Sequence, residues 1–406
     1  MDGRGGRRAR ETQHPSIAHE SLRPGAPGEL LVNLPLSLTS NRKPTLVISG
    51  VNITNTGVLA VFTDALTSLS SECRDAYRII ALVHSKSLFD IPGIEFMEYP
   101  DIKRSWSKRL YFEYVECRTI SEQIRPHLWL AMHDVTPNVT ASIRAVYCHN
   151  ANPYYPFRVS DALLDWKFGV FTLLYRFLYA INLNSNDFVI VQQDWLRRAF
   201  QKRYGLRNVI VAHPSVGHVG VPAQTGLSNG SEGLYRFFYP SFPRVFKNFE
   251  QILRAAQELE ASGFDRFELW LTIDGTETRY ARKLFHEFSS LTTIRWLGLL
   301  PREEVMLRYQ RADCLIFPSK LETWGMPLTE FKSTGKPILA IDLPYAHETV
   351  GEYGQAAFFP PGGDIQLAAM MRAAVNHGRV FGPVRADQIA QPFAENWQEL
   401  WKMLLG

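Results

Sequence analysis

The chain has 406 residues, of which 46% are apolar and 21% are charged, and its formal net charge is +4. This length predicts two domains with ample core, and the composition is that of an ordinary globular protein. The mild net charge does not favour nucleic-acid binding, so no nucleic acid is expected as a partner.

The four cysteines, at positions 73, 117, 148 and 314, are widely spaced and form no C-x-x-C pair. This spacing indicates neither a zinc site nor a disulfide framework, so a reducing, cytoplasmic location is expected. No apolar run reaches the ~18–20 residues that a membrane span needs. The start of the chain is rich in Arg, Gly and Pro without a stretch of signal-peptide type, and residues 1–40 are expected to form a disordered tail.

After the tail, short apolar strands alternate with helical patterns. A buried strand at Thr45–Ser49 is followed by a polar loop at Gly50–Gly57 and a helix at Val58–Leu69. The further strands predicted in this half are Arg78–Val83, Leu128–Met132, Ala145–Cys148, Phe188–Val191 and Val209–Ala212. This alternation predicts a parallel sheet covered by helices on both faces, which assigns residues 41–212 to a Rossmann-like domain.

Residues 213–233 are dense in Gly, Ser and Pro, which predicts a linker, and a second series of strands and helices follows in residues 234–385. Its strands are predicted at Leu234–Tyr239, Phe267–Ile273, Thr293–Leu297, Cys314–Phe317 and Pro337–Ile341, and its helices at Asn248–Leu259, Glu277–Phe288, Arg302–Arg311 and Pro327–Thr334. Asn248 is expected to cap the first of these helices. Residues 386–406 contain an amphipathic helix, Phe393–Leu405, which is predicted to cross back onto the first domain. The predicted fold class is α/β, with two Rossmann-like parallel-sheet lobes facing each other across a cleft.

The segment from Phe317 to Glu330 carries the strongest functional signal. It is predicted to form a buried strand, a turn with Glu322 and Gly325, and a helix that opens at Pro327. Two carboxylates therefore flank one helix N-terminus, where free N–H groups and the helix dipole suit a diphosphate. A carboxylate beside that diphosphate can accept hydrogen bonds from sugar hydroxyls. This geometry predicts sugar transfer from a nucleotide donor.

A second group of polar residues follows the first strand of the second domain. Ligands of open parallel sheets bind beyond the carboxyl ends of the strands, so the loop at 239–247 is expected at the cleft. Arg244 and Lys247 are suited to neutralise a leaving diphosphate, and Ser241 is suited to hydrogen-bond it. The alternative interpretation of these two cations is a solvated helix start.

The first domain contributes candidates from two of its loops. His149 and Asn150 end a predicted strand, where the imidazole is suited to bind the donor sugar or to take a proton from the acceptor hydroxyl. A structural histidine is the alternative. His133 and Asp134 form a weaker candidate pair after another strand. Gly57 precedes a predicted helix whose N–H groups are suited to phosphate or acceptor.

Several motifs of other enzyme classes are missing from the sequence. No D-x-D occurs, although metal-dependent single-lobed transferases normally use one to hold the cation bound to their nucleotide. Neither the dinucleotide-binding G-x-G-x-x-G after Ser49 nor a Walker Gly-Lys-Ser/Thr is present. We therefore expect no cofactor and no metal, with Arg and Lys acting on the diphosphate.

With these residues, the chain resembles the retaining glycosyltransferases of family four (glycosyltransferase group 1), which have the two-lobed GT-B fold. Their E-x7-E motif is matched by Glu322 and Glu330, and the PS before it and the GKPILA after it also fit. The loop with Arg244 and Lys247 resembles the basic phosphate-binding loop of the family, with a narrower spacing between the two cations. His149 resembles the histidine that the family places near the donor sugar.

The resemblance implies a hexose transferred with retention from a nucleotide-sugar to a glycan or lipid-linked acceptor of bacterial surface polysaccharide (O-antigen, capsule or exopolysaccharide). It implies that Glu330 binds the ribose and that Glu322 contacts the hexose. The expected catalytic residues are Glu322, His149, Lys247 and Arg244, and the expected donor-binding residues are Glu330, Ser241, Gly325, Met326, Pro327, Asn150 and Gly57. The first lobe would bind the acceptor and the second lobe the nucleotide-sugar.

Two basic and aromatic segments of the first domain, Ile102–Tyr114 and Asp194–Arg207, suit peripheral contact with an anionic membrane. Solvated charged faces are the alternative interpretation. The apolar segment Trp166–Leu183 is either a core helix or one that enters the lipid interface. Two other functions remain open, namely a sugar-nucleotide 2-epimerase of similar fold and a non-catalytic module that binds nucleotide-sugars.

Overall fold

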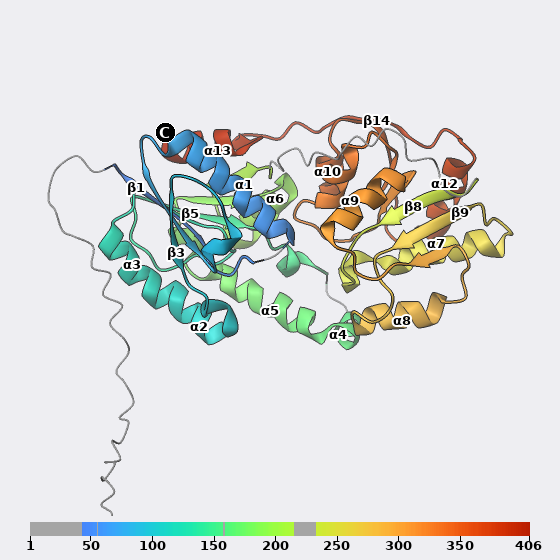
Figure 1. Cartoon of the computed structure of the whole chain (residues 1–406), viewed down its shortest axis with the longest axis horizontal. Coiled ribbons are helices and arrows are strands. Elements are labelled where there is room, and N and C mark those ends of the chain that lie inside the picture. Colours follow the sequence, from blue (N-terminus) through green and yellow to red (C-terminus); the bar gives the residue numbers. More distant parts are fainter. Residues whose placement is uncertain (1–42, 55, 157–158, 215–232) are drawn as a thin grey trace, which may run out of the picture. The chain divides into compact units, whose positions relative to one another are not determined.

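The structure is a computed structural model that describes residues 43–54, 56–156, 159–214 and 233–406. The expected tail at 1–40 lies outside the described residues, as does most of the expected linker at 213–233. The described chain forms two α/β lobes, each built on its own sheet (Figure 1).

The first lobe contains an eight-stranded, all-parallel sheet in the order β15-β7-β6-β5-β4-β1-β2-β3. Its strands are β1 (Thr45–Gly50), β2 (Arg78–Val83), β3 (Ile94–Glu98), β4 (Leu128–Ala131), β5 (Ile143–Cys148), β6 (Phe188–Val191), β7 (Val209–Ala212) and β15 (Phe393–Ala394). The helices around it are α1 (Thr56–Cys73), α2 (Trp106–Tyr111), α3 (Cys117–Ile124), α4 (Val159–Leu164), α5 (Trp166–Ala180) and α6 (Asp194–Tyr204). The central strands are buried almost throughout, because helices cover both faces of a parallel sheet.

The second lobe contains a seven-stranded sheet in the order β10-β9-β8-β11-β12-β13-β14, in which only β14 runs antiparallel among the described strands. Its strands are β8 (Tyr235–Tyr239), β9 (Phe267–Leu271), β10 (Ile294–Trp296), β11 (Cys314–Phe317), β12 (Ile338–Ile341), β13 (Tyr353–Phe359) and β14 (Gly382–Val384). Its helices are α7 (Phe249–Ala261), α8 (Arg279–Phe288), α9 (Arg302–Arg311), α10 (Met326–Lys332), α11 (Pro344–Val350) and α12 (Asp364–Val375). These two parallel-sheet lobes confirm the predicted fold class.

The C-terminal segment returns to the first lobe, as predicted. Helix α13 (Trp397–Leu405) lies beside α1, and the indole Nε1 of Trp401 donates to Ser68 Oγ at 3.2 Å (Figure 1). The expected start of this helix at Phe393 is wrong, because Phe393 and Ala394 pair with β7 as an edge strand. The helix begins after Asn396, whose side chain accepts a hydrogen bond from the N–H of Glu399.

The expected cap at Asn248 is also wrong. Asn248 precedes α7 with a left-handed φ of 57°, and its side chain makes no capping bond. Its Nδ2 instead donates to Gln251 Oε1 at 2.7 Å and to the carbonyl of Pro318 at 3.0 Å. The amide therefore joins the loop after β8 to the loop after β11, where two of the sequence-predicted site segments lie.

Hydrogen bonds also connect α6 of the first lobe to α11 of the second. Gln193 Nε2 donates to the carbonyl of Tyr345 at 3.0 Å and to Thr349 Oγ1 at 2.8 Å. The backbone N–H of Asp194 donates to the carboxylate of Glu348 at 3.0 Å. None of the described helices is both long enough and apolar enough to span a bilayer.

Candidate active site

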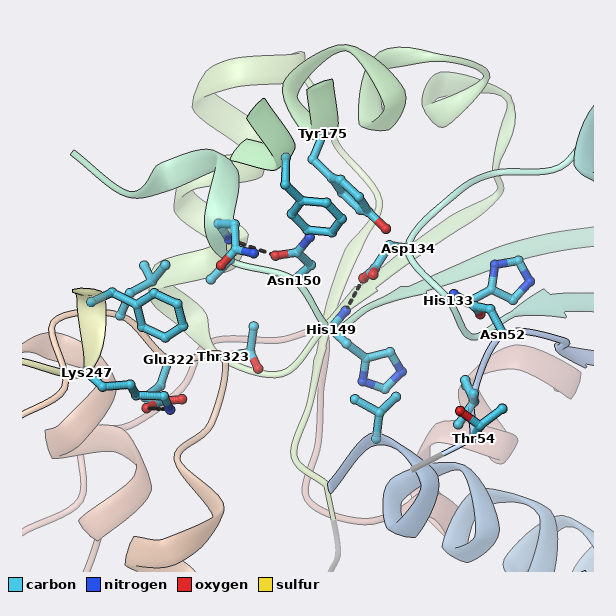
Figure 2. Close-up of a pocket in the computed structure, with 17 residues that line it drawn as sticks. Asn52, Thr54, His133, Asp134, His149, Asn150, Tyr175, Lys247, Glu322 and Thr323 are labelled. Carbon is cyan, nitrogen blue, oxygen red and sulfur yellow. Dashed lines mark hydrogen bonds and ion pairs between the residues drawn. The ribbon is translucent and has the colours of Figure 1, made fainter. Parts of the chain in front are cut away.

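A cavity of about 370 Å³ is lined by residues of both lobes. Figure 2 shows Lys247, Glu322 and Thr323 of the second lobe on one side and the first-lobe residues around His149 on the other. The full lining is Asn52, Ile53, Thr54, Val58, His133, Asp134, His149, Asn150, Ala151, Asn152, Phe171, Tyr175, Phe246, Lys247, Leu321, Glu322 and Thr323. The cavity lies beyond the carboxyl ends of β1, β4 and β5, where ligands of open parallel sheets bind.

The second lobe contributes a direct ion pair to this cavity. Lys247 Nζ lies 2.5 Å from Glu322 Oε1, and the two side chains are only 18% and 14% exposed. Lys247 is held at its backbone, because Tyr239 Oη donates to its carbonyl at 2.9 Å. Its ammonium also lies 5.3 Å from the ring centroid of Phe246. A cation and a carboxylate are thus fixed together at the cavity wall.

The first lobe positions His149 through its backbone. The N–H of His149 donates to Asp134 Oδ1 at 2.6 Å, and Tyr179 Oη donates to the same oxygen at 2.9 Å. Asp134 has a φ of 75°, in the left-handed region that few residues other than glycine adopt. Such strain persists only where the surroundings enforce it and is common at functional sites.

The imidazole of His149 is neutral and keeps one nitrogen for a ligand. Burial lowers its pKa, with the carboxylate of Asp134 opposing the shift. The amide Nε2 of Gln192 lies 3.5 Å from Nδ1, and since that amide nitrogen can only donate, the ring proton is assigned to Nε2. Within the described part of the chain Nε2 has no hydrogen-bond partner. It is therefore a buried, unpaired donor at the cavity wall.

A buried cluster of titratable side chains lies behind His133 at the cavity wall. His133 Nδ1 is 3.3 Å from Glu113 Oε1, and its Nε2 is 3.0 Å from Ser49 Oγ. Arg109 donates to the carbonyl of His133 at 2.8 Å. Burial raises the pKa of Glu113 to about 8, against the opposing charge of Arg109, and burial lowers the pKa of His133 to about 3. Glu113 lies on a π-helical turn, Phe112–Glu116, a geometry frequent near functional sites.

Glu330 is held by another helix and does not line the cavity. Its Oε1 lies 2.9 Å from Arg302 Nη2, and its Oε2 accepts a hydrogen bond from Tyr309 at 3.1 Å. Burial raises the pKa of Glu330, with Arg302 opposing the shift. The two glutamates of the predicted pair therefore have separate partners.

Arg244 and Ser241 also lie outside the cavity lining. Arg244 Nη1 forms an ion pair with Asp165 Oδ2 of the first lobe at 2.7 Å. The backbone N–H of Ser241 donates to Thr272 Oγ1 at 2.8 Å, which ties its loop to the end of β9. Lys247 of the basic loop therefore lines the cavity. Arg244 of the same loop instead contacts the start of α5, because its partner Asp165 is the residue that caps this helix.

The remaining predicted donor-binding residues start helices or end strands. Gly325, with a φ of 89°, precedes Met326 and Pro327, which open α10. A Cβ placed on Gly57 would lie 3.8 Å from Met326 Cγ, so the starts of α1 and α10 approach each other closely. Asn150 lines the cavity, and its Oδ1 accepts the N–H of Asn152 at 2.9 Å.

The structure therefore gathers Lys247, Glu322, His149 and Asn150, and it places the other predicted site residues around this group. Sequence reasoning did not single out Phe171 and Tyr175, which reach the cavity from α5. Their only signal was the aromatic content of that segment, which is also typical of a core helix. The polar loop at 50–57 supplies Asn52, whose buried Oδ1 has no partner among the described residues.

Comparisons with known proteins agree with this architecture. Residues 230–388 match the family model described as glycosyl transferases group 1. O-antigen chain mannosyltransferase B of Escherichia coli is 30% identical over 112 residues, which span 27% of this chain and 29% of that relative. The match thus covers less than a third of the relative's length.

Solved structures resemble nearly the whole described chain at low sequence identity. A glycosyltransferase from Rickettsia africae has a TM-score of 0.60 and 13% identity, covering 83% of this chain and 89% of the other. WaaG, a glycosyltransferase involved in lipopolysaccharide biosynthesis, has a TM-score of 0.57 and 12% identity, covering 82% and 90%. HepE of Anabaena, solved in complex with UDP and glucose, has a TM-score of 0.53 and 13% identity, covering 82% and 90%. At such identities the likeness concerns the fold. Residues 230–388 are thus similar to the group 1 glycosyl transferases, and the chain as a whole has the GT-B fold.

Proposed function

We propose that this protein is a retaining glycosyltransferase that moves a hexose from a nucleotide-sugar to a glycan or lipid-linked acceptor of bacterial surface polysaccharide. The observation that carries the proposal is the Lys247–Glu322 ion pair in a cavity that His149 also lines, the buried Nε2 of which has no partner among the described residues. The names of similar proteins support the substrate class. They include an O-antigen chain mannosyltransferase and a protein solved with UDP-glucose.

Each of these side chains has a role in the proposed reaction. Lys247 neutralises the charge that develops on the departing diphosphate. Glu322 stabilises positive charge at the anomeric carbon and accepts hydrogen bonds from the hexose. Neutral His149 donates from Nε2 to a sugar hydroxyl, and the leaving phosphate takes the proton of the acceptor hydroxyl on the same sugar face.

We also propose that the reaction needs neither a metal ion nor a cofactor. Support comes from Lys247, which supplies positive charge where a divalent cation would otherwise act, and from the lack of a D-x-D sequence. Turnover in the presence of a chelator is expected to match turnover with added Mg²⁺ or Mn²⁺. A strict requirement for either ion would contradict this part of the proposal.

The direct test is the slow hydrolysis of nucleotide-sugars in the absence of acceptor, followed as released nucleoside diphosphate. Lys247→Ala and Glu322→Gln are expected to lower the rate by about 10²-fold or more, because each removes charge stabilisation at the reacting centre. Lys320→Ala is the matched control. Lys320 lies two residues before Glu322 in the loop after β11, but it pairs with Glu250 at 3.4 Å and does not line the cavity.

A thermal-shift screen with GDP, UDP, ADP, CDP and TDP identifies the base of the donor nucleotide. The nucleoside diphosphate that binds the native state raises the melting temperature of the protein. The matching sugar nucleotides, with mannose and glucose first, then serve in the hydrolysis test. Tight nucleotide binding with no turnover, unchanged in Lys247→Ala, would favour a non-catalytic binding module. Conversion of the donor to its 2-epimer would favour the epimerase.

A further inference from the structure

Helix α5 exposes a continuous apolar stripe on the first lobe. The spacing of its outward-facing side chains, three or four residues apart, places them on one side of the helix. They are Val170, Leu173, Leu174, Phe177 and Ile181, the last of which caps the helix. Phe177 is 67% exposed, so this stripe is not covered by any described part of the chain. Contiguous exposed apolar surface of this kind marks an interaction site.

The opposite side of α5 is already used by the protein. Phe168, Tyr175 and Tyr179 are almost fully buried, and Tyr175 lines the cavity together with Phe171. Burial of the inner side explains why the helix forms and how it is fixed. The outer stripe adds nothing to the core, and no described part of the chain covers it, so it is left for a binding partner.

A neighbouring segment adds positive charge beside α5. The exposed ring of Trp106, at the start of α2, lies 6.2 Å from Phe171 and 6.1 Å from Tyr175 between ring centroids, so α2 begins next to α5 (Figure 1). Lys103, Arg104 and Lys108 flank this tryptophan and are exposed. The sequence contains no Asp or Glu from 102 to 112 or from 166 to 186, and Asp101 pairs with Arg104 at the edge.

We propose that the outer face of α5, together with the start of α2, docks the protein on a membrane surface that contains anionic lipid. An amphipathic helix with flanking cations binds such a surface by burying its apolar face near the headgroups while the cations contact lipid phosphates. A second copy of the chain fits less well, because a symmetric contact would bring the same cations toward one another. The inference rests on the proposed function only for its consequence, that the acceptor is lipid-linked.

The position of the helix relative to the cavity gives the docking surface a purpose. Residues on one side of α5 line the cavity, and residues on the other side would lie in the lipid interface. An acceptor sugar carried by a lipid in that interface is thereby held within about one helix diameter, roughly 10 Å, of the reacting groups.

The test is co-sedimentation of the full chain with vesicles of phosphatidylcholine alone or mixed with phosphatidylglycerol. Wild type is expected to bind the anionic vesicles, more weakly at high salt. The double variant Leu173→Gln/Phe177→Gln is expected to bind at least roughly tenfold more weakly, because each side chain loses the gain from burial. Arg104→Gln/Lys108→Gln is expected to lower binding to the anionic vesicles and to leave the weak binding to phosphatidylcholine unchanged.

The matched control is Leu299→Gln/Ile365→Gln, since both side chains are exposed apolar residues of the second lobe. This control is expected to bind vesicles like wild type, and all three variants are expected to retain donor hydrolysis and melting temperature. Wild-type hydrolysis without vesicle binding, or equal loss in the control, would overturn the docking surface and leave the proposed function intact. Vesicle binding without donor hydrolysis would support the docking surface and overturn the proposed function. A dimer in light scattering that the Leu173→Gln/Phe177→Gln variant abolishes would also overturn it, in favour of a second copy.

Discussion

Among the buried side chains of the first lobe, Glu113 is the one whose charge should respond to pH near neutrality. Its pKa is raised to about 8 in the folded protein from a usual value of 4.5, so the folded state keeps a proton that the unfolded state has released. Stability is therefore lost as pH rises from the lower value through the higher one. His133 acts in the opposite direction, but only at pH values between about 3 and 6.5.

Glu113→Gln should remove this dependence, because a glutamine keeps the shape of the protonated acid and cannot ionise. Between about pH 6.5 and about pH 9, wild type should lose about 2 kcal/mol of unfolding free energy more than the variant. Urea unfolding of both proteins at the two pH values measures the difference. Equal losses in the two proteins would show that Glu113 is already ionised in the folded state at the lower pH.

Glu330 offers a second test at the level of one side chain. Glu330→Gln replaces the carboxylate that accepts from Tyr309 and pairs with Arg302, so stability should fall by about 1 kcal/mol. If the carboxylate also binds the ribose, affinity for the nucleoside diphosphate should fall about tenfold, as measured by calorimetry. Tyr309→Phe is the control, since it disturbs the same network while leaving the carboxylate in place. An unchanged affinity in Glu330→Gln would argue against a ribose-binding role.

Elements whose sequence pattern has one physical interpretation were predicted well. The buried strands Arg78–Val83, Phe188–Val191 and Cys314–Phe317 have the predicted bounds, because continuous apolar runs between polar turns suit only the interior of a parallel sheet. The prediction missed β3 and β13, which lie toward the sheet edges and are only partly buried. Because these strands are partly exposed, polar residues interrupt their apolar pattern. The sequence therefore does not mark them as buried strands.

The site was predictable to the extent that it follows from strand ends. Lys247, Glu322 and His149 each come shortly after a strand, and the topology brings such positions together. The partners of Arg244 and Glu330 were not predictable, because Asp165 and Arg302 meet them through the packing of whole helices. No spacing in the sequence encodes that contact.

Asp165, at the start of α5, makes two separate interactions that substitutions can distinguish. Asp165 Oδ1 accepts the N–H of Phe168 as a helix cap at 3.1 Å, and Oδ2 pairs with Arg244. Asp165→Ala should cost about 1–2 kcal/mol of stability, most of it from the lost cap. Arg244→Ala leaves the cap in place, removes the partly exposed ion pair and a contact with the ring of Phe242, and should cost about 0–1 kcal/mol. Thermal melts of both variants separate the two bonds, and equal losses would contradict the capping role.

At the scale of the molecule, the first lobe depends on a segment that follows the entire second lobe in sequence. Trp397, Leu400, Trp401 and Leu404 of α13 are buried in the core around α1 and β1. This core cannot be complete until the last residues of the chain have returned. The lobes should therefore fail to behave as independent folding units, even though each has its own sheet.

Trp401→Ala tests this dependence. The side chain is 2% exposed, so its loss should cost about 3–5 kcal/mol, and the whole protein should melt at a lower temperature in one transition. Leu299→Ala is the control, because that side chain is 54% exposed in the second lobe and its loss should cost about 0.5 kcal/mol or less. Hydrogen exchange reports where protection is lost. Loss confined to α13, with β1 and α1 still protected, would show that the lobe folds without its last helix.

The ion pair between Arg244 and Asp165 has a consequence for turnover. A donor whose diphosphate attracts Arg244 must draw it away from Asp165, which then keeps only its bond to the start of α5. On the proposed function, each cycle of donor arrival and nucleotide departure would alternately release and recapture one end of α5, whose inner side lines the cavity and whose outer side carries the apolar stripe. The outer face of the helix would thereby respond to occupation of the donor site.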